Sequence, residues 1–181
     1  MIYQKKRRRK SYFEVGYKME RKAISKVRLL IGSGKTISTM ESCTGGLLAS
    51  TITDCSGASD IISGAFITYS NEAKTACGVP VEIIDKYGVY SQETSAAMAK
   101  ACSDAYSTDI GVGITGSLGR KDPHNPDSRV GKVYYSIIMD GTVTSVELDI
   151  PDGIRDRHDM KEYIVDDVLE KLVSLIRNMC K

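Results

Sequence analysis

The stretch TISTMESCTGGLLASTIT, residues 36–53, decides the fold of this chain. Its first five residues are mainly β-branched or apolar, which is typical of a strand, and the closing LLASTIT is compatible with a helix. The intervening ESCTGG combines hydroxyl, thiol and glycine residues. A strand that turns into a helix through such a corner presents a hydroxyl or thiol beside free backbone N–H groups. The corner therefore suits an anion, an oxyanion or a nucleophile.

Helix and strand patterns alternate on both sides of this corner. Asp140-Gly141 between two apolar runs is a strong hairpin signal. Interleaved helices and strands with one hairpin predict an α/β fold, a three-layer α/β/α sandwich around a mixed, mostly parallel sheet with an antiparallel hairpin. We predict helices over residues 17–32, 47–53, 71–77, 81–87, 91–106 and 156–178, and strands over residues 36–40, 61–70, 109–115, 130–139 and 142–150.

Length and charge predict one domain with a short appendage. A chain of 181 residues that is 41% apolar has the size of one domain with its own core. We predict a basic, flexible N-terminal arm over residues 1–16 and a single domain over residues 17–181, because residues 5–10 are all Lys or Arg. Docking of this arm on nucleic acid is the alternative, and we expect no nucleic-acid partner. No apolar stretch approaches roughly 20 residues and no signal-peptide core follows the basic block, so we expect no membrane partner and a cytoplasmic location.

Cysteine and histidine usage narrows the possible chemistry. The five cysteines are scattered and contain no Cys-x-x-Cys pair, so neither a disulfide framework nor a zinc site is indicated. We expect no metal and no cofactor. Only Cys43 lies inside a motif. The two histidines, His124 and His158, lie in a proline-containing loop and near the start of the last helix, which does not favour a Ser/His/Asp triad.

Without a local histidine, a Ser42 nucleophile needs another base. Lysine fills that role when burial lowers its pKa toward neutrality. Lys74 is the candidate, because it begins a helix directly after the strand that carries Tyr69. This spacing would bring the phenol and the amine to one point beside the corner. A solvent-facing lysine is the alternative interpretation.

Six short motifs follow one another along the chain: ESCTGG (41–46), GASD (57–60), YSNEAK (69–74), GVP (78–80), AMA (97–99) and TG (115–116). In this order they resemble the motifs of the CinA C-terminal domain family, whose members include the nicotinamide-nucleotide amidohydrolases, or NMN deamidases. The similarity covers roughly residues 24 to 178. It implies a three-layer α/β/α fold, a homo-oligomer, and hydrolysis of the carboxamide of nicotinamide mononucleotide (NMN), a pyridine nucleotide, to nicotinate mononucleotide and ammonia.

The resemblance implies Ser42 as nucleophile, Lys74 as general base and Tyr69 as the hydrogen-bonding partner of the pair. Backbone N–H groups around Thr44, Gly45 and Gly46 at the helix start would stabilise the oxyanion. Cys43 is the alternative nucleophile, because a thiolate near a helix N-terminus is reactive. The implied substrate-binding residues, with Arg155 a bidentate partner for phosphate, are Cys43, Thr44, Gly45, Gly46, Thr115, Gly116 and Arg155.

Two departures from the family pattern affect the predicted substrate. Charged residues replace a glycine-rich loop, and Arg120, Lys121 and Arg129 either contact phosphate in place of backbone amides or obstruct NMN. Near the last helix, Asp159 occupies the position of a second arginine, for which Arg157 is a possible substitute at a different helical phase. The alternative function is therefore a catalytically impaired nucleotide-binding or protein-interaction domain of the same fold.

Overall fold

One five-stranded sheet runs through the part of the chain that the computed structural model describes, which is residues 22–119, 125 and 128–179. Its spatial order is β2-β1-β3-β4-β5, with β1 parallel to β2 and β3, and with β4 antiparallel to β3 and β5. Four strands thus run in one direction, and the hairpin supplies the one that opposes them. The strands are β1 (Ile37–Glu41), β2 (Ile62–Ile67), β3 (Ile110–Gly116), β4 (Lys132–Met139) and β5 (Thr142–Asp149).

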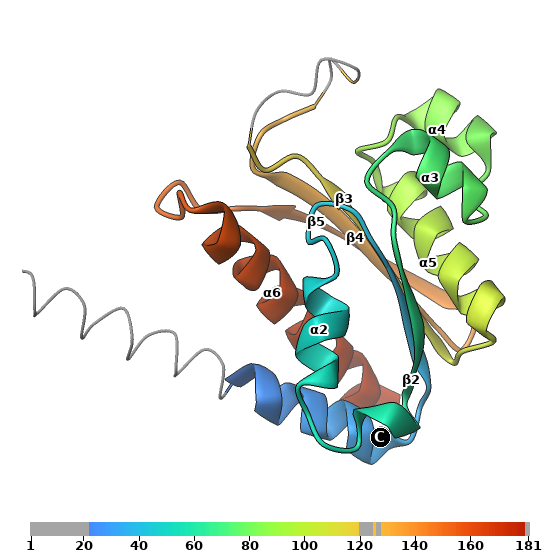
Figure 1. Cartoon of the computed structure of the whole chain (residues 1–181), viewed down its shortest axis with the longest axis vertical. Helices are drawn as coiled ribbons and strands as arrows, with labels where there is room; N and C mark the ends of the chain where they lie inside the picture. The colour runs from blue at the N-terminus through green and yellow to red at the C-terminus, as the bar shows by residue number, and fades with distance from the viewer. Residues whose placement is uncertain (1–21, 120–124, 126–127, 180–181) are drawn as a thin grey trace, which may run out of the picture.

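Helices cover both faces of this sheet (Figure 1). On one face, α5 packs against β1, β3 and β4, with α4 against α5. The opposite face carries α2, α6 and the helical residues 22–33. These three layers confirm the predicted α/β/α sandwich. The helices are α2 (Leu47–Thr53), α3 (Asn71–Ala76), α4 (Val81–Tyr87), α5 (Gln92–Tyr106) and α6 (Arg157–Met179), with a 3-10 turn at Ala58–Asp60.

The predicted strand over residues 61–70 is too long. β2 ends at Ile67, and Ser70 instead caps α3 by accepting the N–H of Ala73 at 3.1 Å. Local capping by Ser70 therefore overrides the β-propensity that Thr68 and Tyr69 add. The predicted basic arm over residues 1–16 lies outside the described residues. Among the helices that are described, none combines the length and apolar character needed to cross a membrane.

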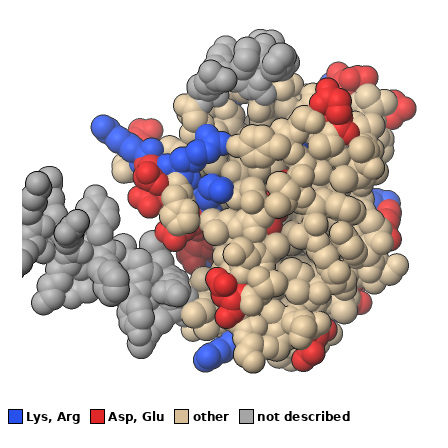
Figure 2. Space-filling view, in the orientation of Figure 1, with Lys and Arg blue, Asp and Glu red and all other residues tan. Residues whose placement is uncertain are grey.

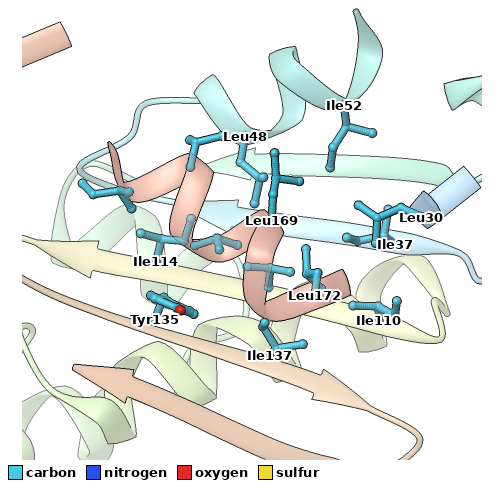
Figure 3. Packing of buried hydrophobic residues seen from close by; sticks show 14 of the residues in the cluster. Leu30, Ile37, Leu48, Ile52, Ile110, Ile114, Tyr135, Ile137, Leu169 and Leu172 are labelled. Atoms are coloured by element: carbon cyan, nitrogen blue, oxygen red, sulfur yellow. The ribbon is translucent and has the colours of Figure 1, made fainter. Parts of the chain in front are cut away.

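The larger hydrophobic core lies between the sheet and α6 (Figure 3). Alternate residues of β3 face it, and the apolar stripe of α6 covers them at helical spacing. Tyr135 is 1% exposed, and its hydroxyl donates to Asp167 Oδ2 at 2.6 Å, so the buried polar atom is satisfied. Core residues labelled in Figure 3 include Leu30, Ile37, Leu48, Ile52, Ile110, Ile114, Tyr135, Ile137, Leu169 and Leu172.

On the opposite face, two glycines of β3 let α5 approach the sheet closely. A Cβ atom on Gly111 would lie 2.2 Å from the Ala99 carbonyl oxygen, and one on Gly113 would lie 2.1 Å from that of Ser95. Both obstructing atoms belong to the helix backbone, which cannot rotate away as a side chain can. The separation of α5 from β3 is therefore set by glycine.

Replacing Gly113 by alanine is expected to lower the free energy of unfolding by about 3 kcal/mol, because the added methyl must push α5 away from β3. Urea unfolding followed by circular dichroism measures the loss. Gly32→Ala is the matched control, since nothing lies within 4 Å of a Cβ atom there. Equal midpoints for the two variants would contradict the close packing of α5.

Candidate active site

The corner between β1 and α2 holds Ser42 at the carboxyl end of a central strand. Its N–H donates to the Ile114 carbonyl of neighbouring β3 at 3.0 Å, which ties the corner to the sheet. Gly45 and Gly46 turn the chain with φ of 63° and 92°, values that other residues rarely adopt. Ser42 is 7% exposed. The sequence therefore fixes this serine between a strand and a turn that requires glycine.

Glu41 caps α2 from inside the protein. Its carboxylate is fully buried and accepts backbone N–H groups from Gly46 at 3.0 Å, Leu48 at 3.1 Å and Ala49 at 2.9 Å. The Thr39 hydroxyl also donates to it at 3.3 Å. A carboxylate at a helix N-terminus satisfies orphan donors and is favoured by the helix dipole. The corner is predicted to suit an anion, an oxyanion or a nucleophile, and the group that accepts the N–H donors of α2 is the protein's own Glu41 carboxylate.

The expected oxyanion donors are only partly available. Gly46 donates to Glu41, and the Gly45 N–H donates to the Ser42 carbonyl at 3.0 Å. The N–H groups of Cys43 and Thr44, in contrast, donate to no other residue that the structure describes. The buried hydroxyl of Thr44 likewise has no hydrogen-bond partner there. Of the three predicted donors, those of Gly45 and Gly46 are therefore already engaged, and only the Thr44 N–H is left, beside the N–H of Cys43.

Lys74 is a buried amine beside Ser42. It extends from α3, is 1% exposed, and its Nζ lies 3.3 Å from Ser42 Oγ and 2.8 Å from the Thr68 carbonyl oxygen. Burial, opposed in part by the nearby negative charge of Glu72, lowers the pKa of Lys74 to about 8. A sizeable fraction of this amine is therefore neutral near physiological pH and able to accept the serine proton.

Cys43 is buried in the core beside the nucleophile. It is 4% exposed, and burial raises the pKa of its thiol to about 12, with the Glu41 charge acting in the same direction. A thiol with such a pKa stays protonated at neutral pH and is a weak nucleophile. Its environment thus favours the packing role over the nucleophilic alternative.

A cavity of about 420 Å³ joins Ser42, Lys74 and Tyr69. This volume is in the range of small-molecule sites. Tyr69 stands at its edge with 64% of the residue exposed, and its hydroxyl oxygen accepts a hydrogen bond from Arg157 Nη2 at 2.7 Å. The structure therefore brings the three predicted catalytic residues to one cavity, whose other lining residues are Ser70, Asn71, Glu72, Val89, Tyr90 and Asn125.

Within the described part of the chain, none of the seven predicted substrate-binding residues lines this cavity. The Thr115 hydroxyl donates to the Val89 carbonyl at 2.9 Å, so it holds a cavity-lining loop in place. Gly116 pairs with Val133 in the β3–β4 ladder, where a Cβ atom would lie 2.8 Å from the Lys132 carbonyl oxygen. Arg155 is exposed in the loop before α6.

The remaining candidates fall on the surface or outside the described residues. His158 is exposed at the start of α6, with Nε2 3.4 Å from Glu162. Asp159 and Arg129 are also exposed. His124, Arg120 and Lys121 lie outside the described residues. Within the part of the chain that is described, no group of three or more His, Cys, Asp or Glu side chains is arranged to hold a metal ion.

Two cations at the start of α6, Arg157 and Lys161, lie near the predicted site residues, and Lys161 is not among the residues identified from the sequence. Arg157 contacts Tyr69, and Lys161, one turn later, has its Nζ 3.4 Å from where a Gly45 Cβ atom would lie. Figure 2 shows Lys and Arg side chains gathered over this end of the molecule. In the sequence, these residues are recognisable as two cations four residues apart in the first turns of a helix, a place where the helix dipole disfavours positive charge.

Comparison with known proteins identifies the family of the chain. The family model of the CinA C-terminal domain matches residues 19–176. The chain belongs to the CinA C-terminal domain family. The resemblance inferred from the ordered motifs is thus confirmed.

Relatives of this CinA-family chain share its sequence or its fold. A CinA-like protein from Kosmotoga olearia is 39% identical over 154 residues, covering 83% of this chain and 37% of that relative. The competence/damage inducible protein CihA from Agrobacterium tumefaciens is 30% identical, with a TM-score of 0.74 over 87% of this chain and 94% of that one. A CinA superfamily protein from Escherichia coli, 23% identical, shares the fold with a TM-score of 0.78 over 87% and 90% of the two chains. The chain spans about a third of the length of the curated relatives it matches.

Proposed function

We propose that this CinA-family chain is an amidohydrolase that converts NMN to nicotinate mononucleotide and ammonia. The observation that carries the proposal is the buried Lys74 amine, 3.3 Å from Ser42 Oγ and with its pKa lowered to about 8. An amide carbon is a poor electrophile, so its hydrolysis needs an activated nucleophile. A neutral amine beside a serine hydroxyl meets that need without a histidine.

The reaction divides into two steps. Lys74 takes the proton of Ser42 as the serine oxygen attacks the carboxamide carbon, and the resulting ammonium returns a proton to the nitrogen that leaves as ammonia. Water then attacks the acyl-serine ester while Lys74 accepts one of its protons. Lys74 returns that proton to Ser42 Oγ as the ester C–O bond breaks, and the nicotinate mononucleotide carboxyl group loses its own proton to solvent. Backbone N–H groups of Cys43 and Thr44 are proposed donors for both oxyanions.

Binding of the nucleotide phosphate is proposed to involve the residues that the family resemblance indicates, although they do not line the cavity. Arg155 is the candidate for bidentate contact, because the guanidinium fork matches phosphate geometry. The position of Thr115 supports an indirect role through Val89, and Gly116 keeps the end of β3 free of a side chain. A cytoplasmic location and a homo-oligomeric state stay predictions.

Incubation of the purified protein with NMN, followed by measurement of ammonia and nicotinate mononucleotide, tests the proposal. Cys43→Ala should keep most of the activity, since its thiol is protonated at neutral pH. Activity lost in Cys43→Ala but kept in Ser42→Ala would reassign the nucleophile. NMN binding without ammonia release would favour the catalytically impaired nucleotide-binding domain.

The rate of NMN hydrolysis is expected to rise with pH through about pH 8. Lys74 must be neutral to accept the serine proton, and the fraction of neutral amine increases as pH rises through its pKa of about 8. The profile of kcat/KM should therefore climb about tenfold per pH unit below 8 and level off above it. Cys43→Ala should show the same profile. A rate that is flat from pH 6 to 9 would contradict Lys74 as the base.

A further inference from the structure

The Arg157 guanidinium is held between two segments that are distant in sequence. Its Nη2 donates to the Tyr69 hydroxyl oxygen at 2.7 Å, and its Nη1 lies 2.7 Å from where a Cβ atom on Gly119 would be. Any side chain at position 119 would thus collide with the guanidinium. Gly119 has no positive φ, so the need for glycine there comes from this space and not from the backbone conformation.

The direction of this hydrogen bond determines what the phenol can do. A guanidinium only donates, so the Tyr69 oxygen must accept with a lone pair. Its own O–H therefore cannot point at Arg157 and is left to donate elsewhere. Tyr69 lines the cavity that also contains Ser42 and Lys74, so that proton is available inside the proposed active site.

Arg157 is also the only hydrogen-bond partner that the described residues give the Tyr69 hydroxyl. The ring is largely exposed, and within the described part of the chain it stacks on no other aromatic ring. Without the arginine, the phenol would sample several rotamers at the edge of the cavity. The hydrogen bond from Arg157 therefore fixes the orientation of the Tyr69 side chain, which packing against other rings does not.

Helix stability does not explain the position of Arg157. It is the first residue of α6, where the helix dipole disfavours a cation, and no carboxylate of the described residues lies within salt-bridge distance of it. The favourable contact seen is the one to Tyr69. An arginine placed against the local dipole and aimed at a cavity residue indicates a role at that cavity.

We infer that Arg157 is a positioning residue, which acts through Tyr69 by directing the phenol O–H into the cavity, and that Gly119 keeps the space in which it does so. This inference rests on the proposed amidohydrolase function. Tyr69 then donates to the reacting serine or amide, and Arg157 never touches the reacting atoms.

A double-mutant cycle on NMN hydrolysis tests the coupling. Arg157→Ala should lower kcat about 10-fold with little change in KM, since a hydrogen bond to a charged group is lost. In the Tyr69→Phe background, Arg157→Ala should have no further effect. Gly119→Ala should lower kcat in the same way without loss of stability, because only the end of a flexible side chain must move. Arg177→Ala, in the last turn of the same helix, should leave kcat unchanged.

Independent effects of Arg157→Ala and Tyr69→Phe would overturn the inference, as would a raised KM with unchanged kcat, which would place Arg157 on the substrate. A second readout does not depend on activity. In protein with ¹³C-labelled tyrosine, the Tyr69 ring signal, identified by its loss in Tyr69→Phe, should shift in Arg157→Ala and Gly119→Ala and stay in place in Arg177→Ala. If the wild type does not hydrolyse NMN, the proposed function is wrong. If the enzyme is active but neither Arg157→Ala nor Gly119→Ala shifts the Tyr69 signal, the inference about Arg157 is wrong.

Discussion

Replacing Lys74 by methionine is expected to reduce the rate of NMN hydrolysis about 10³-fold while leaving the protein at least as stable as the wild type. Methionine fills similar space but cannot accept a proton, so the base is lost and the packing is kept. Removing an amine that is 1% exposed also removes the cost of burying a cation. Initial rates at pH 8 and urea unfolding of the same preparation measure the two quantities.

The controls for this experiment separate chemistry from structure. Ser42→Ala should lose activity to a similar degree, because the pair acts as a unit. Lys100→Met, on the exposed face of α5 where the amine pairs with Asp104, should keep full activity. If Lys74→Met retained more than about a tenth of the activity, a different base would have to serve Ser42.

Replacing Glu41 by alanine is expected to lower the free energy of unfolding by about 3 kcal/mol. The substitution leaves the N–H groups of Gly46, Leu48 and Ala49 without their buried acceptor. Guanidinium chloride unfolding followed by circular dichroism provides the measurement.

Two further variants test whether the loss of stability comes from the missing hydrogen-bond acceptors. Glu41→Gln keeps the shape but turns one acceptor into a donor, so it should be nearly as destabilising as Glu41→Ala. Glu82→Gln, in the exposed first turn of α4, should change stability by less than about 0.5 kcal/mol. A loss below about 1 kcal/mol for Glu41→Ala would mean that another group or water replaces the carboxylate.

Elements bounded by strong local signals could be predicted from the sequence to the residue. α4 begins after Pro80 and ends at Gly88, and α2 begins after Gly46, as predicted. The strand predicted over residues 61–70 extends beyond β2 because the β-branched and aromatic pattern continues up to Ser70, which caps the next helix. A serine side chain that caps a helix competes with continuation of the strand, and residue composition alone does not show which of the two forms.

The candidate site was predictable only in part. Ser42 and Lys74 are 32 residues apart, and their contact depends on the parallel pairing of β1 with β2, which spacing does not determine. The use of Thr115 to hold Val89, and of Glu41 to cap α2, likewise depends on contacts that form only in the folded chain. The family motifs identify the candidate site residues, and the packing of the folded chain determines which groups each of them contacts.

The strand order has a consequence for how long the proposed catalytic pair survives under stress. Ser42 follows β1, whereas Tyr69 and Lys74 follow β2, which is one of the two edge strands and, among the strands that the structure describes, pairs only with β1. Proteins open locally in units that can unfold while the rest of the structure stays intact, and an edge strand is held by one neighbour only. One local detachment of β2 would therefore separate nucleophile from base, even while the rest of the domain stays folded.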